Sequence, residues 1–297
     1  MDSKQVVMIS GSSTGFGKLI AETLARRGHQ VFATMRDPAV RNAANAAALR
    51  SLVGKENVAL EVIEMDVTDE ASVERAVHTV VEKAGRIDVA INNAGYALTG
   101  LEEAATLEQV RSLMDTNFLG CVRVNRAVLP FMRKQRSGLL MHISSGAGRV
   151  VLPGYGYYCA SKFAMEAMAE AYHYELAQQG IESIVVPGPY QTLVINNAVQ
   201  GADKARANSY GSVNEVAGKI ERALTAAAAD PQEVADVVAV IVETPAGQRK
   251  LRYRVSPTDL GVDAINEVCA QVQERAIEVF GIKAETEFAQ RSAAGAD

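Results

Sequence analysis

The stretch Leu139–Ala164, LLMHISSGAGRVVLPGYGYYCASKFA, joins an apolar run to two serines and a tyrosine-rich segment. The run Leu139–Ile143 predicts a buried strand, and the tyrosine-rich segment predicts the start of a helix after a loop. Tyr158 is the only one of the three tyrosines with a lysine, Lys162, four residues later. Residues at this spacing lie one helical turn apart on the same face, so the two side chains are expected to be neighbours.

A tyrosine beside a lysine is suited to proton transfer at an alcohol or carbonyl oxygen. A free phenol has a pKa near 10, which makes it a poor base at neutral pH. A neighbouring ammonium favours the phenolate and is expected to lower that pKa. Ser144 or Ser145 could hold the substrate oxygen. A YxxxK pattern by itself most often belongs to an ordinary amphipathic helix with a solvated lysine, so the interpretation depends on the rest of the chain.

The composition indicates a soluble globular protein. The chain has 297 residues, 48% of them hydrophobic, and a net charge of −5, and no basic run suggests a nucleic-acid partner. Three scattered cysteines without a CxxC pair suggest reduced thiols, and the four histidines lack the spacing of a zinc site. Because we find neither a signal peptide nor an apolar run of about 18 residues, we expect a cytoplasmic protein without a membrane segment.

Short apolar runs alternate with helical periodicity along the chain. We expect strands at Val6–Ser10, Val31–Thr34, Val58–Ile63, Ile87–Ile91, Leu139–Ile143, Ile181–Val186 and Leu251–Val255, and helices at Gly15–Arg27, Arg41–Leu52, Glu70–Lys83, Thr106–Lys134, Tyr155–Gln179, Pro231–Glu243 and Asp263–Phe280. This alternation predicts an α/β fold of the Rossmann type, a doubly wound parallel sheet of about seven strands with helices on both faces. We expect a single domain over residues 1–297, with a substrate-loop insertion at 193–229 and a C-terminal helical extension at 256–297.

The glycine-rich stretch SGSSTGFG, Ser10–Gly17, joins the first predicted strand to the first helix. Backbone N–H groups at a helix N-terminus bind phosphate oxygens, and glycines let the backbone come close. The spacing is not GxGxxG, and the match to an NTPase P-loop is incomplete because Ser12 and Leu19 replace required residues. A nucleotide-binding loop is therefore favoured, with a plain tight turn as the alternative.

The end of the second predicted strand bears on cofactor choice. Met35 stands where NAD-binding folds place an acidic residue that takes the ribose 2′-hydroxyl. Arg36 follows and could face a 2′-phosphate, which favours NADP(H). Asp37 is a rival acid that would favour NAD(H), and Arg36 could equally be a solvated surface charge.

Together these motifs resemble the short-chain dehydrogenase/reductase family over about Gln5–Thr192. The family's TGxxxGxG motif matches Ser10–Gly17 with Ser for Thr and Phe for Ile, and its NNAG motif matches Asn92–Gly95. The resemblance implies that Asp66 and Val67 contact adenine. The implied cofactor-binding residues are Gly11, Ser13, Thr14, Gly15, Phe16, Gly17, Arg36, Asp66, Val67, Asn93, Ala94, Gly95, Tyr158, Lys162, Pro187, Gly188 and Thr192.

The resemblance also implies a catalytic set. Tyr158 would be the general acid in reduction and the base in oxidation, and Lys162 would lower its pKa and hold the nicotinamide ribose. Ser145, thirteen residues before Tyr158, fits the family's serine better than Ser144 and would orient the substrate oxygen. Asn117, in the stretch DTNFLG, would keep a water in a proton relay behind Lys162.

The segments VFATMRDP and GRVVLPGYGYYCASKFA resemble the hydroxysteroid-dehydrogenase-like branch. That branch implies hydride transfer between NADP(H) and a secondary alcohol or ketone, with a steroid-like or other apolar carbonyl as the small-molecule substrate. The alternatives are an NAD(H)-dependent dehydrogenase of the same fold and a non-catalytic NADP(H)-binding regulatory protein. A serine hydrolase is disfavoured, because Ile143 occupies the first glycine position of GxSxG. The two long predicted helices, at 106–134 and 155–179, resemble the family's interface helices and imply a homodimer or homotetramer.

Overall fold

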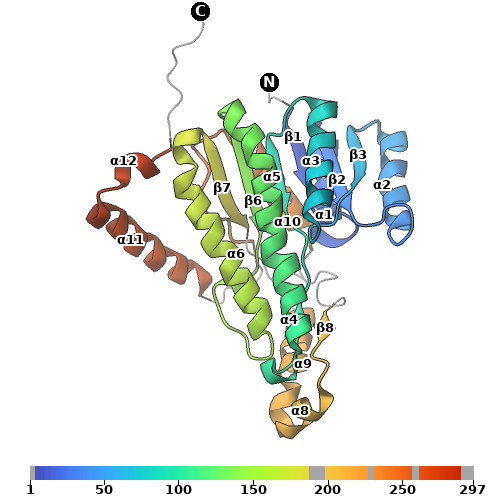
Figure 1. Ribbon diagram of the computed structural model, residues 1–297, viewed down its shortest axis with the longest axis vertical. Coiled ribbons are helices and arrows are strands. Elements are labelled where there is room, and N and C mark those ends of the chain that lie inside the picture. Colours follow the sequence, from blue (N-terminus) through green and yellow to red (C-terminus); the bar gives the residue numbers. More distant parts are fainter. Residues whose placement is uncertain (1–3, 187–197, 227–229, 256–260, 289–297) are drawn as a thin grey trace, which may run out of the picture.

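A computed structural model describes residues 4–186, 198–226, 230–255 and 261–288 (Figure 1). Its main sheet is parallel, with strand order β3-β2-β1-β4-β6-β7. The strands are β1 Val6–Ile9, β2 Gln30–Met35, β3 Leu60–Glu64, β4 Val89–Asn92, β6 Gly138–Ile143 and β7 Ile181–Val186. The predicted Rossmann-type α/β fold is confirmed, with six strands in this sheet rather than about seven.

Leu251–Val255, the segment expected to be the seventh strand, runs beside β7 without forming a regular ladder. The Val185 N–H donates to the Leu251 carbonyl at 2.9 Å, and the Tyr253 N–H donates to the Val185 carbonyl at 3.1 Å. Arg252 makes a single parallel bridge with Val185. Ion pairs of the Arg252 and Arg254 side chains hold the segment in place of a strand ladder.

Helices cover both faces of the sheet (Figure 1). On one face lie α1 Gly15–Arg26, α2 Ala43–Glu56 and α10 Gln232–Glu243, and on the other α3 Glu70–Ala84, α5 Gly120–Gln135 and α6 Gly156–Glu175. Alternate residues of β1 enter the two apolar cores: Val7 and Ile9 pack on the first side, and Val6 and Met8 on the second. Apolar side chains on both faces of the strands are what a helix-covered parallel sheet requires.

The helix predicted over Thr106–Lys134 is interrupted. Its first part, α4 Leu107–Met114, begins with a capping box in which Thr106 Oγ1 accepts from the Gln109 N–H at 3.2 Å and Gln109 Oε1 accepts from the Thr106 N–H at 3.0 Å. A π-helical turn, Asp115–Leu119, then leads into α5, which contains Pro130. Such π turns are frequent at functional sites, and this one carries Asn117.

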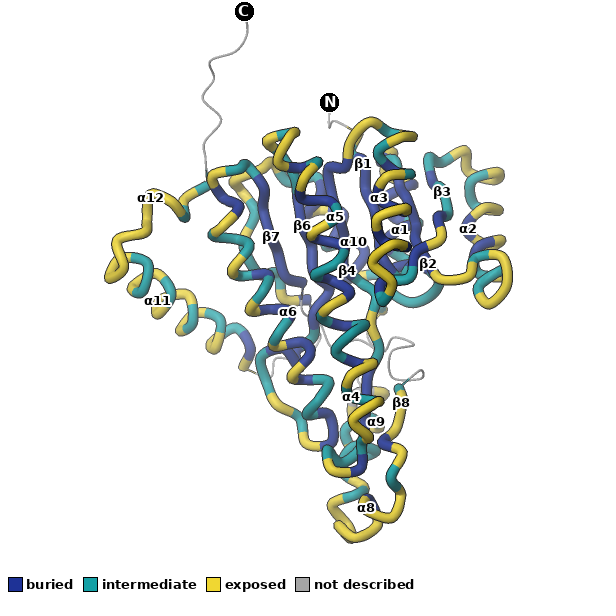
Figure 2. Tube along the Cα trace, in the orientation of Figure 1, coloured by how far each residue is buried: buried dark blue, intermediate teal, exposed yellow. Residues whose placement is uncertain are grey.

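Beyond β7 the chain adds two groups of elements to the sheet. β8 Val199–Gln200, α8 Lys204–Ser209 and α9 Val216–Ala226 lie past the carboxyl ends of the strands, where β8 pairs with β5 Leu98–Thr99 (Figure 1). On the side of α6 lie α11 Val262–Phe280 and α12 Lys283–Thr286, and α11 is largely exposed (Figure 2). Within the described ranges, no helix is both long and apolar enough to cross a bilayer.

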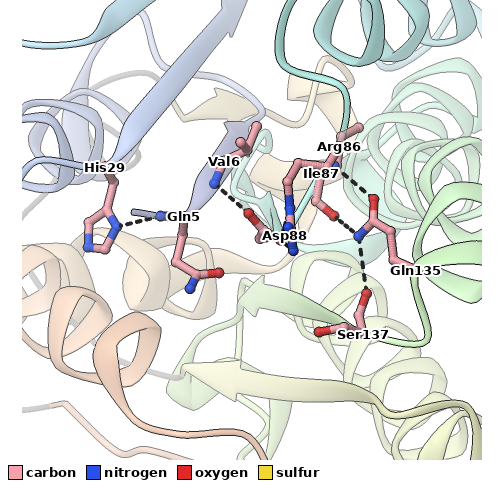
Figure 3. Close-up of polar contacts among 8 residues, drawn as sticks. All are labelled: Gln5, Val6, His29, Arg86, Ile87, Asp88, Gln135 and Ser137. Atoms are coloured by element: carbon pink, nitrogen blue, oxygen red, sulfur yellow. Dashed lines mark hydrogen bonds and ion pairs between the residues drawn. The ribbon is translucent and has the colours of Figure 1, made fainter. Parts of the chain in front are cut away.

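At the amino ends of the strands, polar side chains bind the backbone (Figure 3). The Asp88 carboxylate, which is buried, accepts from the Val6 N–H at 2.8 Å and from Arg86 Nε at 2.7 Å. The Gln135 side-chain amide accepts from the Ile87 N–H at 3.1 Å and donates to the Ile87 carbonyl at 2.9 Å. These bonds satisfy backbone groups where β1 and β4 begin.

Candidate active site

The strand order reverses between β1 and β4, because β2 and β3 continue on one side and β6 and β7 on the other. Ligands of open α/β sheets bind in the crevice outside the carboxyl ends of the strands at such a point. Three loops that follow β1, β4 and β6 at this edge carry the predicted motifs: Ser10–Gly17, Asn93–Gly95 and Ser144–Ser145.

The glycine loop touches the Asn93–Gly95 segment directly. Gly11 has φ of 69°, and a Cβ there would lie 2.8 Å from the Ala94 Cα. A Cβ at Gly17 would lie 2.4 Å from both the Gly11 carbonyl oxygen and Asn93 Nδ2. Side chains at these two positions would push the loops apart, so glycine is required at both.

Ser10 and Asn93 hold the two loops together. The buried Ser10 hydroxyl accepts from the Asn93 N–H at 3.0 Å and the Ala94 N–H at 3.1 Å. Asn93 Nδ2 donates in return to the carbonyls of Ser10 at 2.9 Å and Gly11 at 3.0 Å. A serine at position 10 thus supplies the hydroxyl that the motif needs.

The N-terminus of α1 follows the glycine loop and can receive an anion. Thr14 is the N-cap residue, but its side chain makes no capping hydrogen bond, and the first turn contains no acidic residue. Ser13, Thr14 and Gly15 are partly exposed, and Phe16 packs against the apolar core. Backbone N–H groups and the helix dipole at this end favour a phosphate, which fits the diphosphate of a dinucleotide.

The residues that bear on cofactor choice follow β2. Met35 is buried, whereas Arg36 and Asp37 are exposed. Asn42 Nδ2 donates to the Arg36 carbonyl at 2.6 Å, and the Asp37 carbonyl accepts from the Asn42 N–H at 2.9 Å. Asn42 therefore fixes the backbone of the turn, and the Arg36 side chain lies at the surface.

The pair Asp66-Val67 follows β3 at the same edge. Asp66 Oδ1 accepts from the Thr68 N–H at 2.9 Å and from its hydroxyl at 2.8 Å. Val67 is buried, and its carbonyl accepts from Arg123 Nη1 at 3.1 Å. Pro187, Gly188 and Thr192, the other implied cofactor contacts, lie outside the described residues.

Ser145, Tyr158 and Lys162 lie together at the ends of β6 and α6. Lys162 is buried, its Nζ donates to the Ile143 carbonyl at 2.9 Å, and it lies 5.9 Å from the centre of the Tyr158 ring. Ser145 lies close enough to Tyr158 to oppose the rise that burial causes in its pKa. Ser144, in contrast, donates to Glu166 Oε1 at 2.8 Å, so Ser145 is the serine that faces the tyrosine.

Asn117 stands beside this group in the π-helical turn. It is fully buried, and its Nδ2 donates to the Tyr96 carbonyl and the Ser161 hydroxyl, each at 3.0 Å. A Cβ on Gly95 would lie 3.0 Å from Asn117 Oδ1 and 3.9 Å from Lys162 Nζ, so both side chains border Gly95.

The electrostatics of the tyrosine differ from the expectation that Lys162 lowers its pKa. Burial raises the pKa of Tyr158 to about 12, although the hydrogen bond with Ser145 opposes that rise. Burial also lowers the pKa of Lys162 to about 8. Both charged forms lose hydration in the same enclosed site. Tyr158 therefore keeps its proton at neutral pH and can donate it.

Two glutamates near α6 belong to none of the sequence motifs and were not predicted as site residues. Glu102 Oε1 accepts from the N–H of Gly156, the first residue of α6, at 2.6 Å. Glu166 is buried one turn after Lys162 and is bound by Ser144. Its spacing from Lys162 was a usable signal, because residues four apart on a helix are neighbours.

An apolar wall lies next to Tyr158. Its buried members come from the loop after β6 and the start of α6, and α9 packs against them from the other side. The cluster consists of Ala147, Tyr155 and Cys159, with Leu152, Tyr158, Ala217 and Ile220 packed against it.

Comparison with known proteins agrees with this geometry. Residues 5–203 match the family model described as short chain dehydrogenase. The chain is 41% identical over 194 residues to the 3-ketodihydrosphingosine reductase of Bacteroides thetaiotaomicron, covering 65% of this chain and 66%, just under two thirds, of that protein. It is 33% identical over 259 residues to human 17-beta-hydroxysteroid dehydrogenase type 1, covering 84% of this chain and 77% of that protein.

Solved structures give the same result. A short-chain dehydrogenase from Streptomyces avermitilis superposes with a TM-score of 0.73 at 29% identity, covering 97% of this chain and 100% of that one. A metagenomic short-chain oxidoreductase in complex with NADP superposes with a TM-score of 0.68 at 25% identity, covering 87% and 99%. The predicted class of oxidoreductase is confirmed, and the chain belongs to the short-chain dehydrogenase family.

Proposed function

We propose that the protein transfers hydride between NADP(H) and a ketone or secondary alcohol, with Ser145, Tyr158 and Lys162 as the proton-transfer site. The observation that carries this proposal is the grouping of these three side chains beside the glycine loop at the switch point of the sheet. Groups that bind phosphate and groups that move a proton thus share one crevice.

Residues of the crevice fit a dinucleotide. The N–H groups at the start of α1 would take its phosphates, and the exposed Arg36 guanidinium would bind the 2′-phosphate. Lys162 would hold the nicotinamide ribose. The complex of a family relative with NADP supports this choice. When bound, the cofactor supplies the hydride.

The chain's own residues would manage the proton. Ser145 would donate a hydrogen bond to the carbonyl oxygen of the substrate and orient it. Tyr158, which is protonated at neutral pH, would give its proton to that oxygen as the carbonyl carbon accepts hydride. The Lys162 ammonium would stabilise the phenolate that remains, and solvent would return the proton to it. The net change is one hydride and one proton added to a ketone.

We propose an apolar carbonyl compound as the substrate. The apolar wall beside Tyr158, including Ile220 of α9, supports this choice. The two relatives bear names that denote a keto lipid base and a hydroxysteroid, which are both largely apolar. Residues 193–229 would serve as the substrate loop, and α9 within them already packs on the wall.

The test is NADPH oxidation driven by a panel of apolar ketones, with wild-type protein and two phenylalanine variants. We expect Tyr158→Phe to lower kcat by about 10²- to 10⁴-fold, because the proton donor is lost. Tyr157→Phe is the matched control, since it changes the neighbouring tyrosine and should retain activity. Full activity of Tyr158→Phe would contradict the proposed mechanism.

We further propose a cytoplasmic homodimer or homotetramer that pairs through α4, α5 and α6. The surface between α5 and α6 contains a groove of about 640 Å³ that a partner helix could fill. Its lining residues include Leu129, Pro130, Tyr172 and Leu176. Light scattering at micromolar concentration should give a multiple of the 31.7 kDa chain mass; a monomeric mass would contradict the assembly.

A further inference from the structure

A buried ionic cluster lies directly behind the proposed proton-transfer site. Glu166 is 1% exposed and stands at its centre. Its Oε2 pairs with Arg149 Nε at 3.1 Å and with Arg252 Nε at 3.2 Å, and its Oε1 accepts from the Ser144 hydroxyl at 2.8 Å. Arg252 also pairs with Glu170 Oε2 at 2.8 Å. The mechanism above uses none of these groups.

Gly148 makes room for this cluster. A Cβ at that position would lie 2.7 Å from Glu166 Oε1 and 2.8 Å from the Ser144 hydroxyl. The loop that carries Ser145 therefore closes tightly around the bond between Ser144 and Glu166. Within that loop, the Ala147 N–H donates to the Ser145 hydroxyl at 3.2 Å, so any shift of the loop would move Ser145.

We propose that Glu166 is a positioning residue of the reaction: it anchors the loop of Ser145 through Ser144 and places a carboxylate one helical turn from Lys162. This inference rests on the proposed function only for its effect on turnover. Glu166 lies outside the Ser-Tyr-Lys group. Arg252 belongs to the same arrangement, because it pairs with the Glu166 carboxylate although it follows that residue by more than 80 positions in the chain.

The surroundings of Lys162 give Glu166 an electrostatic role as well. Cys121 on α5 and His142 on β6 face the ammonium, and burial keeps both neutral by raising the pKa of Cys121 to about 12 and lowering that of His142 to about 3. Burial lowers the pKa of Lys162, and Cys121 and then Glu166 oppose that fall; of these two, the Cys121 thiol is protonated at neutral pH. Tyr158 is protonated, so it adds no charge at neutral pH. Burial raises the pKa of Glu166, and the Ser144 hydroxyl, Arg252 and Arg149 oppose that rise.

Glu170 offers a matched control for this proposal. It lies on the same helix and pairs with the same arginine, but Ser144 and Lys162 interact with Glu166. Glu166→Gln and Glu170→Gln each remove one carboxylate from Arg252. Because Glu166→Gln also removes the partner of Arg149, a difference between the two variants supports a positioning role only together with the same effect in Ser144→Ala, which keeps every ion pair.

The first readout is hydrogen–deuterium exchange of the 144–148 loop in the free proteins. Glu166→Gln and Ser144→Ala should speed exchange of the loop amides at least about tenfold, and Glu170→Gln should not. Ser144→Ala leaves both ion pairs intact, so it tests the anchor even if Glu166→Gln fails to fold. Equal exchange in Ser144→Ala and wild type would overturn the anchoring role.

The second readout is the pH dependence of NADPH binding, followed by fluorescence, and of kcat with the best ketone. In Glu166→Gln the alkaline fall in both quantities should move to lower pH by about one unit, because Lys162 loses a neighbouring negative charge. Glu166→Asp should restore most of the wild-type profile. Equal shifts in Glu166→Gln and Glu170→Gln would overturn the proposal. If wild-type protein binds NADPH but reduces no ketone, the proposed function fails, while the exchange and binding results still decide the role of Glu166.

Discussion

The two ends of the same sheet use polar residues in opposite ways. At the amino ends, Asp88 and Gln135 form hydrogen bonds with backbone groups where the strands begin, and these bonds stabilise the fold (Figure 3). At the carboxyl ends, Tyr158, Lys162 and Glu166 interact with other side chains in a buried site. The comparison shows that burial of polar groups alone does not mark a site; Lys162 also donates to a backbone carbonyl, and what distinguishes it is its second neighbour, the Tyr158 ring.

Among the changes that test the contrast between the two ends, Gly17→Ala at the carboxyl end is expected to have the largest effect. The new Cβ would lie 2.4 Å from the Gly11 carbonyl, which belongs to backbone and cannot turn aside. We expect NADPH affinity to fall about 30-fold or more, which corresponds to about 2 kcal/mol. Gly54→Ala is the control, because nothing lies within 4 Å of its Cβ position. Titration by cofactor fluorescence measures both, and unchanged affinity in Gly17→Ala would remove the glycine loop from the proposed site.

Asp88→Ala tests the amino end. The variant would leave the buried Val6 N–H without its acceptor, at a cost of about 1–3 kcal/mol in the free energy of unfolding. Because this edge is remote from the proton-transfer site, kcat and KM should stay within about twofold of wild type. Urea unfolding and steady-state kinetics provide the two measurements. A large loss of kcat with unchanged stability would break the contrast between the two ends.

Arg36→Ala sharpens the part of the comparison that concerns the cofactor. The exposed guanidinium can contribute one charge-assisted contact to a 2′-phosphate. Its removal should weaken NADPH binding about tenfold, or about 1.4 kcal/mol, and leave NADH binding unchanged. Equal losses for both cofactors would mean that Arg36 does not read the phosphate. Tighter binding of NADH than NADPH by wild-type protein would favour Asp37 as the ribose acid.

The smallest effect at neutral pH is expected from His142, which is buried near the carboxyl end of β6 and bonded to scaffold side chains. Its ring is 3.4 Å from Asn92 Nδ2 and 3.3 Å from the Ser183 hydroxyl. Burial lowers its pKa to about 3 from an ordinary value near 6.5, so the unfolded chain binds a proton first as the pH falls. Stability should be retained above about pH 6.5 and decline below it by at most about 1.4 kcal/mol per pH unit from this group.

Urea unfolding of His142→Gln between pH 5 and 8 checks this expectation. The acid-side slope should be smaller than in wild type by about one proton, whatever the absolute stability of the variant. His173→Gln is a useful companion, because burial lowers the pKa of His173 as well. An unchanged slope in His142→Gln would show that His142 already binds a proton in the folded state.

The sequence predicts best where a local pattern determines the structure. The strands from Val6 to Val186 and the glycine loop follow from apolar runs and glycine spacing, and the structure agrees with them. Leu251–Val255 alternates apolar and polar residues as a strand does, but the ion pairs of Arg252 and Arg254 hold it in place. A local sequence pattern cannot predict such partners.

The same limit applies to the candidate site. The spacing of Tyr158 and Lys162 predicted that they are neighbours, and their distance agrees. The pKa values of both groups depend on burial, which residue spacing does not reveal. We expected a lowered pKa for Tyr158, but burial raises it in the free protein. The spacing of Glu166 from Lys162 is visible in the sequence, but its partners Ser144, Arg149 and Arg252 are brought together only by the fold.

The pairing of Glu166 with Arg252 has a consequence for how the protein is made. Helix α6 is complete in the nascent chain long before residue 252 leaves the ribosome, and until then Glu166 lacks one of its two arginines. Burying that carboxylate early would leave its charge only partly compensated. The segment around the proton-transfer residues should therefore stay loosely packed during synthesis and become ordered once the chain after α10 docks beside β7.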